Sequence, residues 1–373
     1  MPISLTTNKQ ELQDALGLAI RAVSPRTAIP ILECFLLTAK QDDGLVISGS
    51  STEMNINTAP INASINLPGT IALDAKLFSD IIRKMPGELV SLEADTNNNV
   101  LVKSGRTKLN VAAKPGDEYP TMHESNENDS TNTYIIKEHI LKDMIRQTIF
   151  SVSTDQSKLI LTGGLIEVKD GNMRMVTVDM YRISYKAVPL EGHAPDAKVV
   201  VPGKALSELA RMLSSDENED VKISITDKRV IFTTSSFTLV SNLLEGEFIR
   251  YDQIFNEDFT TMVETNRANL LEAFERASLI AVDTKMPPTK MEITDNDLII
   301  SAQNDRGDRM EDGIPCTTDG KELTISFNPR YFIDALRVVE DEKIILKFNT
   351  QLSPATIRGT DESYKYLIVP LRP

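Results

Sequence analysis

Six basic residues recur at matched places along the sequence and form its clearest chemical pattern. A lysine or arginine stands near the start of three similar segments, and an arginine follows seven residues later; the pairs are Lys76 with Arg83, Lys204 with Arg211, and Arg330 with Arg337. In a helix seven residues make about two turns, so each pair shares a face. A cation in the first turn opposes the helix dipole, so its threefold recurrence suggests a gain elsewhere. A helix N-terminus beside a basic side chain suits a phosphate group; the alternative is a solvated surface position.

Other residue types that could do chemistry form no recognisable constellation. The histidines and cysteines of the chain are His123, His139, His193, Cys34 and Cys316. The histidines have no partner at metal-ligand spacing and stand in no nucleophile motif, and the cysteines lack CxxC spacing. Residues 305–308 resemble a calcium loop only in part, and no glycine-rich phosphate loop occurs. We therefore expect no enzyme activity, no metal site and no cofactor.

The helices that would position the basic residues repeat with a nearly constant period. Leu12, Leu141 and Leu270 lie in equivalent apolar-periodic helices and are each 129 residues apart. A second set of strand–turn–helix segments spans residues 71–83, 199–211 and 325–337. Asp74 and Asn328 are typical helix N-caps in this second set. Because the two sets are offset by about half a period, we expect each copy to consist of two similar halves.

Alternating apolar and polar segments between the helices predict antiparallel strands. Each copy is then an α+β unit of two helices on antiparallel sheets. The polar run at residues 124–132 marks a first linker, and a second boundary falls near residue 255. We predict three tandem domains, at residues 1–125, 133–255 and 256–373.

The charge balance gives a misleading first impression of the partner. The chain has 373 residues, with 40 basic and 54 acidic residues and a net charge of −14, which alone argues against a nucleic acid. Three domains in an arc could nevertheless present their basic helices on one concave wall, and two arcs would close a ring. The chain has no long apolar stretch and no signal segment at its start, so we expect a cytoplasmic protein that does not bind membranes.

Four segments resemble the family of the bacterial DNA polymerase III beta subunit, the processivity sliding clamp. They are residues 24–32, 178–183, 244–251 and 366–373, and with the three repeats the resemblance covers the whole chain. It implies a head-to-tail homodimeric ring that encircles double-stranded DNA without reading its sequence. It also implies tethering of the DNA polymerase III catalytic subunit, an ATP-driven clamp loader, and other replication and repair proteins that bind through short peptides.

The resemblance and the repeat pattern together suggest three groups of site residues. The expected DNA-contacting residues are Arg26, Lys76, Arg83, Lys158, Lys204, Arg211, Arg330 and Arg337. The expected partner-peptide pocket consists of Leu161, Val178, Met180, Tyr181, Arg182, Ile183, Ile249, Ile254, Asn328, Tyr331, Leu352, Pro354, Leu367, Val369, Pro370, Leu371 and Arg372. The expected dimer interface pairs Leu109 and Val111 with Leu279 and Ile280, although both pairs could equally be core.

Three positions depart from the family pattern. Met180 replaces a common glycine, Ile249 a usual proline, and Gln253 an arginine that can occur there. We expect these changes to alter peptide preference while the pocket persists. The alternative functions are a non-enzymatic β-rich scaffold unrelated to DNA, and a hydrolase, for which the sequence shows no catalytic constellation.

Overall fold

The computed structural model describes residues 3–24, 26–95, 97–120, 132–192, 194–255, 259–280, 288–360 and 362–372. The chain forms two compact units: unit 1 comprises Met1–Lys142 and Ser207–Leu243, and unit 2 comprises Asp143–Leu206 and Leu244–Pro373. His123, His193 and the expected domain boundaries at residues 125 and 256 lie outside the described residues.

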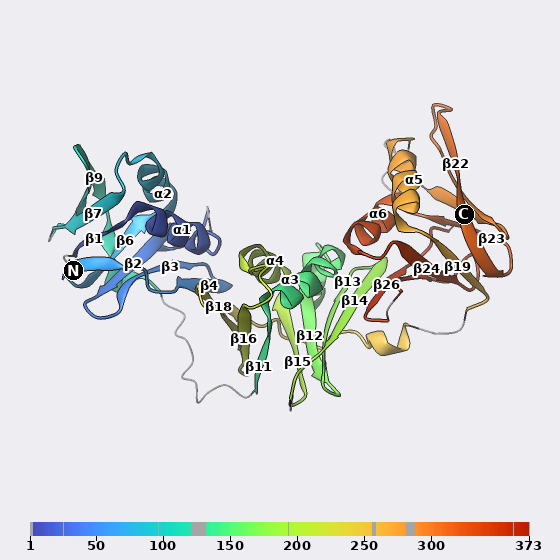
Figure 1. The fold of residues 1–373 in the computed structure, drawn as a ribbon, viewed down its shortest axis with the longest axis horizontal. Helices are drawn as coiled ribbons and strands as arrows, with labels where there is room; N and C mark the ends of the chain where they lie inside the picture. Colours follow the sequence, from blue (N-terminus) through green and yellow to red (C-terminus); the bar gives the residue numbers. More distant parts are fainter. Residues whose placement is uncertain are drawn as a thin grey trace. The chain divides into compact units, whose positions relative to one another are not determined.

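One segment type, a strand followed by a helix and three strands, repeats six times along the described chain (Figure 1). The α-helices of these segments are α1 (Lys9–Ala19), α2 (Ala75–Lys84), α3 (Glu138–Arg146), α4 (Gly203–Met212), α5 (Arg267–Ile280) and α6 (Pro329–Val338). Two segments make one copy of the repeat. The prediction of three tandem α+β copies, each built of two similar halves, is therefore confirmed.

The helices α2 and α6 begin at the cap residues that the sequence predicted. The carboxylate of Asp74 accepts a hydrogen bond from the Leu77 amide at 2.7 Å, and the side chain of Asn328 accepts one from the Arg330 amide at 3.1 Å. Leu12, Leu141 and Leu270 are completely buried, since each faces the sheets beneath its helix. The cap residues and the apolar period together orient each helix with its polar side outward.

Unit 1 contains two sheets, one of five strands and one of nine. The first has the order β5 (Ala63–Leu67), β1 (Ser4–Asn8), β7 (Leu89–Ala94), β8 (Asn99–Ser104) and β9 (Thr107–Ala112). The second has the order β10 (Lys114–Pro115), β6 (Gly69–Asp74), β2 (Cys34–Lys40), β3 (Gly44–Ser50), β4 (Met54–Thr58), β18 (Phe237–Asn242), β17 (Arg229–Thr233), β16 (Asp220–Ile225) and β11 (Asn132–Lys137).

Unit 2 is built on one continuous sheet of twelve strands. Its order is β15 (Ala197–Pro202), β12 (Gly163–Lys169), β13 (Asn172–Val178), β14 (Arg182–Pro189), β26 (Tyr364–Ile368), β25 (Ala355–Arg358), β24 (Lys343–Phe348), β19 (Thr261–Asn266), β22 (Arg309–Gly320), β21 (Asp297–Gln303), β20 (Thr289–Ile293) and β23 (Leu323–Phe327). The helices α5 and α6 pack together over its core, where the rings of Phe274 and Phe332 stack 4.4 Å apart.

Consecutive copies of the repeat are joined by direct strand pairing. Strand β4 of the first copy pairs antiparallel with β18 of the middle copy, with Ile56 opposite Leu239. Strand β14 of the middle copy pairs in the same way with β26 of the third copy, with Ser184 opposite Tyr366. The middle copy therefore shares a sheet with each neighbour, which is why it is divided between the two units.

Candidate functional site

The predicted peptide-pocket residues all belong to unit 2, although they come from separate stretches of sequence. Leu161, Val178, Ile183 and Leu367 lie in one buried apolar cluster. The cluster forms because β13, β14 and β26 are neighbours in the sheet and residues 244–255 pack on this face. Sequence reasoning missed other members of the cluster, since they read as ordinary strand or loop residues; they are Leu165, Val176, Val200, Phe248 and Tyr251.

A cavity of about 170 Å³ opens beside this cluster. Its wall includes the predicted residues Ile254, Pro354 and Leu367. It also includes Phe259 and Lys347, which the sequence did not suggest; the Lys347 ammonium lies 4.4 Å from the centre of the Phe259 ring. This end of the candidate site thus combines aliphatic walls with a cation held against an aromatic face.

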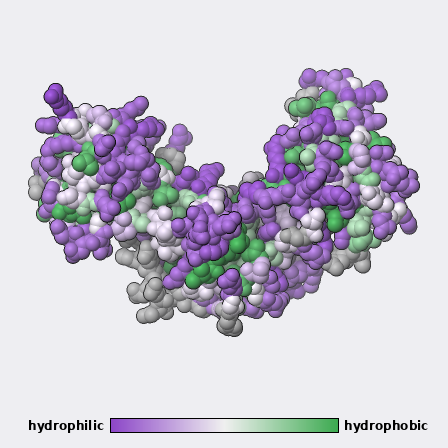
Figure 2. All heavy atoms as spheres, viewed as in Figure 1, coloured by the Kyte–Doolittle hydropathy of each residue, from purple (hydrophilic) through white to green (hydrophobic). Residues whose placement is uncertain are grey.

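Three other predicted pocket residues leave large apolar side chains in solvent. The exposed fractions of Met180, Leu352 and Val369 are 65%, 59% and 37%. Figure 2 shows that one face of the protein is largely hydrophilic, with apolar residues gathered in small patches. Exposed aliphatic side chains are what an extended peptide with apolar anchors would contact.

Arg182 is held by groups of its own chain. Its guanidinium donates to Asp179 at 2.9 Å, to Asp334 at 2.6 Å and to the carbonyl of Phe150 at 2.6 Å. It also lies 4.5 Å from the centre of the Tyr331 ring. These contacts fasten the middle copy to the third, and the contribution of Arg182 to peptide binding stays a prediction.

The C-terminal tail crosses the same junction. The amide of Val369 donates to the carbonyl of Tyr181, and the amide of Leu371 donates to the carbonyl of Ser326, both at 2.8 Å. Strand β26 ends at Ile368, two residues before Pro370, which has no amide hydrogen for a sheet. Of the remaining predicted pocket residues, Asn328 is buried as the cap of α6, and the backbone carbonyl of Tyr331 accepts from the Tyr366 hydroxyl at 2.9 Å.

The eight predicted DNA-contacting residues are all exposed. Lys76, Lys204 and Arg330 occupy the second residue of α2, α4 and α6, as the repeat pattern predicted. Within the described residues these three form no ion pair. Their charges are therefore available to a phosphate group in solution.

The second cation of each helix is partly neutralised by a carboxylate. Arg83 pairs with Asp80, Arg211 with Glu208 at 2.9 Å, and Arg337 with Glu275 at 2.8 Å. An exposed arginine in such a pair contributes less net positive charge to its surface than a free lysine does. The first-turn cations are consequently the stronger candidates for phosphate contact.

The four predicted interface residues differ in exposure. Leu109 on β9 is 40% exposed and Leu279 near the end of α5 is 72% exposed, whereas Val111 is 6% exposed. Ile280 is half-buried and packs against the core of unit 2. The alternative that these residues are core therefore fits Val111 and does not fit Leu109 or Leu279.

Two further properties of the described residues bear on function. None of their helices is both long and apolar enough to cross a membrane. They also contain no group of three or more histidine, cysteine, aspartate or glutamate residues that could hold a metal ion.

Comparison with family models finds the three domains of the DNA polymerase III beta subunit in order along the chain. The N-terminal domain matches residues 3–123, the central domain residues 135–249 and the C-terminal domain residues 252–372. These matches follow the three copies seen in the fold.

Comparison with curated proteins and solved structures agrees over the full length. The beta sliding clamp of Bacillus subtilis (strain 168) is 32% identical, covering 99% of this chain and all of that protein, and that of Staphylococcus epidermidis is 29% identical over 99% of each. The crystal structure of the Bacillus subtilis DNA polymerase sliding clamp superposes with a TM-score of 0.95 at 31% identity, covering both chains completely. A putative DNA polymerase III beta subunit from Eubacterium rectale gives 0.94 at 33% identity, over 99% of this chain and all of that one.

Proposed function

The chain belongs to the DNA polymerase III beta subunit family, and from this premise we propose that it acts as a sliding clamp that encircles duplex DNA and tethers the replicative polymerase. A ring linked topologically to DNA needs no tight binding, because it can leave only by opening or by sliding off an end. Weak, salt-dependent phosphate contacts without base readout then allow movement along the duplex. The protein would be an accessory subunit without catalysis of its own, located in the cytoplasm, and an ATP-driven clamp loader would open the ring.

The strand pairing between consecutive copies is the main observation that supports a ring-shaped dimer. Because β4 pairs with β18 and β14 pairs with β26, the middle copy offers one strand to its predecessor and one to its successor. In the first copy the strand equivalent to β18 and β26 is β9, which among the described strands pairs with β8 alone. In the third copy the equivalent of β4 and β14 is the first half of β22, which pairs with β21. A second protein chain would satisfy both edges head to tail.

The pairing also supplies a register for the proposed interface. Leu109 lies opposite Val102 on β8 just as Leu239 lies opposite Phe232 on β17. Leu239 faces Ile56 across the first junction, and the position equivalent to Ile56 on β22 is Met310, opposite Ala302 on β21. We therefore expect Leu109 of one chain to lie opposite Met310 of its partner.

The end of α5 completes this interface by the same argument. Leu279 follows Phe150 by 129 residues, which is the spacing of the repeated helices. Phe150 packs against Tyr366 of the third copy with their ring centres 5.9 Å apart. Tyr366 is the counterpart of Leu109, so the exposed Leu279 would contact Leu109 of the partner subunit. Burial of two exposed leucines per interface favours association.

The basic helices would contact DNA, and the peptide pocket of unit 2 would bind partner proteins. Lys76, Lys204 and Arg330 would face the DNA phosphates, helped by Arg26, Lys158 and the arginines two turns along each helix. The exposed aliphatic residues beside the 170 Å³ cavity would receive short peptides of the polymerase, the clamp loader and repair proteins.

Loading on nicked circular DNA tests the function directly. A clamp loader and ATP should place the protein on the circle, where it should remain during gel filtration. Cutting the circle with a restriction enzyme should then release it within minutes, because a ring slides off a free end. Retention on the linear product, or equal loading without the clamp loader, would contradict a sliding ring.

A further inference from the structure

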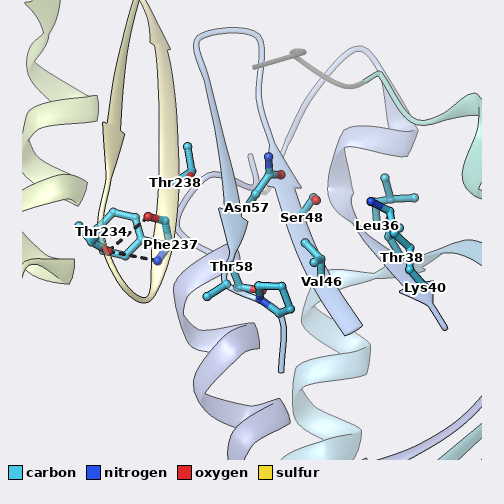
Figure 3. Close-up of a pocket in the computed structure, with 12 residues that line it drawn as sticks. Leu36, Thr38, Lys40, Val46, Ser48, Asn57, Thr58, Thr234, Phe237 and Thr238 are labelled. Atoms are coloured by element: carbon cyan, nitrogen blue, oxygen red, sulfur yellow. Dashed lines mark hydrogen bonds between the residues drawn. The ribbon is translucent and has the colours of Figure 1, made fainter. Parts of the chain in front are cut away.

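Unit 1 carries a surface groove of about 440 Å³ that the proposed clamp function leaves unused (Figure 3). It lies over β2, β3, β4 and the turn that leads into β18. Its lining includes the apolar Leu36, Val46, Pro60 and Phe237, and the polar residues are Thr38, Lys40, Ser48, Asn57, Thr58, Thr234 and Thr238. A volume of this size is within the range of ligand-binding pockets.

The floor of the groove is one transverse row of the sheet. Leu36 pairs with Ser48, Ser48 with Asn57, and Asn57 with Thr238 across the four strands. The repeat places an equivalent row in unit 2: Leu165 pairs with Val176, Val176 with Tyr185, and Tyr185 with Lys365. The two rows occupy the same place in two copies of one fold.

In unit 2 the chain covers this row with its own aromatic residues. Tyr251 and Phe255 lie against Tyr185, with ring centres 6.0 Å and 5.9 Å away. The Tyr251 hydroxyl donates to Glu167, which lies opposite Arg174 in the next outward-facing row of the sheet. Tyr251 is 2% exposed and belongs to the buried cluster. The surface is thus built to take a tyrosine from an extended segment with a short helical turn.

The unit 1 row carries smaller side chains at three of the four corresponding positions, which leaves an open volume beside Leu36, itself buried in a cluster with Tyr119. Ser48 occupies the position equivalent to Val176, Asn57 the position equivalent to Tyr185, and Thr238 the position equivalent to Lys365. Thr38, opposite Val46, occupies the position equivalent to Glu167, and its hydroxyl is a hydrogen-bond acceptor on the groove wall. Apolar walls with a hydroxyl at the floor suit a phenol ring.

We propose that this groove of unit 1 binds a linear segment of a partner protein that presents a tyrosine, in the way that unit 2 binds residues 250–255 of its own chain. The site is separate from the unit 2 peptide pocket, so the proposal holds whether or not that pocket binds the polymerase.

A peptide of the chain's own sequence is the matched probe. We would titrate the capped hexapeptide of residues 250–255, Arg-Tyr-Asp-Gln-Ile-Phe, into the full-length protein labelled at leucine and valine methyl groups. The methyl resonances of Leu36 and Val46 should shift saturably. Replacing the peptide's tyrosine by alanine should weaken binding at least about tenfold, as loss of a buried aromatic anchor does.

Two tryptophan variants, one in the groove and one on a distant strand, locate the binding. Thr238→Trp should fill the groove and weaken binding by about tenfold or more, whereas Ser64→Trp, on exposed strand β5, should leave the affinity unchanged. Both variants should keep the thermal midpoint of the wild type. Absence of shifts at Leu36 and Val46, or equal binding to the alanine peptide, would overturn the proposal. A variant in which a glycine–serine segment replaces residues 121–131 provides a further test. If this variant binds the peptide more tightly than the wild type, the proposal is overturned, because the replaced segment of the chain would be the natural occupant of the groove.

Discussion

Arg182 on β14 and Asp334 on α6 form an ion pair across the junction of the middle and third copies, with 2.6 Å between their nearest atoms. The Arg182 side chain is only 11% exposed and also donates to Asp179 and to the Phe150 carbonyl. Arg182→Ala would leave all three acceptors without this donor. We expect it to lower the free energy of unfolding by about 2–4 kcal/mol, measured by denaturant titration.

The matched control for Arg182 is an exposed arginine in unit 2. Arg250 lies 3.9 Å from Glu247, with both side chains about four-fifths exposed. Arg250→Ala should change stability by less than about 0.5 kcal/mol. Equal losses in the two variants would mean that the junction does not depend on the Arg182 contacts.

The proposed ring interface predicts that Leu279→Asp will separate the dimer. A carboxylate at this 72% exposed position should leave the single chain folded, since nothing in the core is disturbed. At the interface it would be buried against Leu109 of the partner subunit. We expect the dimer dissociation constant to rise on the order of 100-fold in sedimentation experiments, as for a central apolar contact. Leu89→Asp, at a 59% exposed leucine of β7, should leave the dimer intact.

The free and paired cations of α4 should differ in their effect on DNA affinity. Lys204→Ala removes an unpaired charge and should reduce the salt slope of duplex binding by about one, measured by fluorescence anisotropy at several salt concentrations. Arg211→Ala should reduce it by less, because Glu208 already pairs with that guanidinium. Lys40→Ala, outside the basic helices, serves as control. A smaller effect at Lys204 than at Lys40 would argue against DNA contact along α4.

The sequence was sufficient where structure depends on local chemistry. The 129-residue period located Leu12, Leu141 and Leu270 in buried helix faces, and cap residues such as Asp74 fixed the helix starts. A hydrogen bond from side chain to nearby backbone needs only a few neighbouring residues, so it can be predicted without the fold.

Relationships between distant strands could not be predicted in the same way. The pairing of β4 with β18 uses backbone hydrogen bonds, which any residues in register can make. Arg182 illustrates the consequence, since its partner Asp334 lies 152 residues away. The contact of Lys347 with Phe259 was missed for the same reason, because neither residue type signals the other.

The cavity in unit 2 predicts a specific loss of peptide affinity. Ile254 lines the cavity and is 39% exposed, so truncating it removes apolar contact from a peptide without opening the core. Ile254→Ala should weaken binding of a polymerase-derived peptide about tenfold in calorimetry. Ile135→Ala, at a 63% exposed isoleucine of unit 1, is the matched control. If both variants bind the peptide like the wild type, the peptide uses another surface.

Glu138 at the start of α3 should make the protein less stable as the pH rises. Burial raises the pKa of its carboxyl above the ordinary 4.5, although the Ser214 amide donates to it at 2.6 Å. A carboxyl with a higher pKa in the folded state binds more protons there than in the unfolded state. The free energy of unfolding therefore falls as the pH rises from about 4.5 through the raised pKa. Glu138→Gln keeps an acceptor for Ser214 and removes the titration. The stability of this variant relative to the wild type should increase over that interval in parallel denaturant titrations, and a constant difference would show that folding does not change the pKa of Glu138.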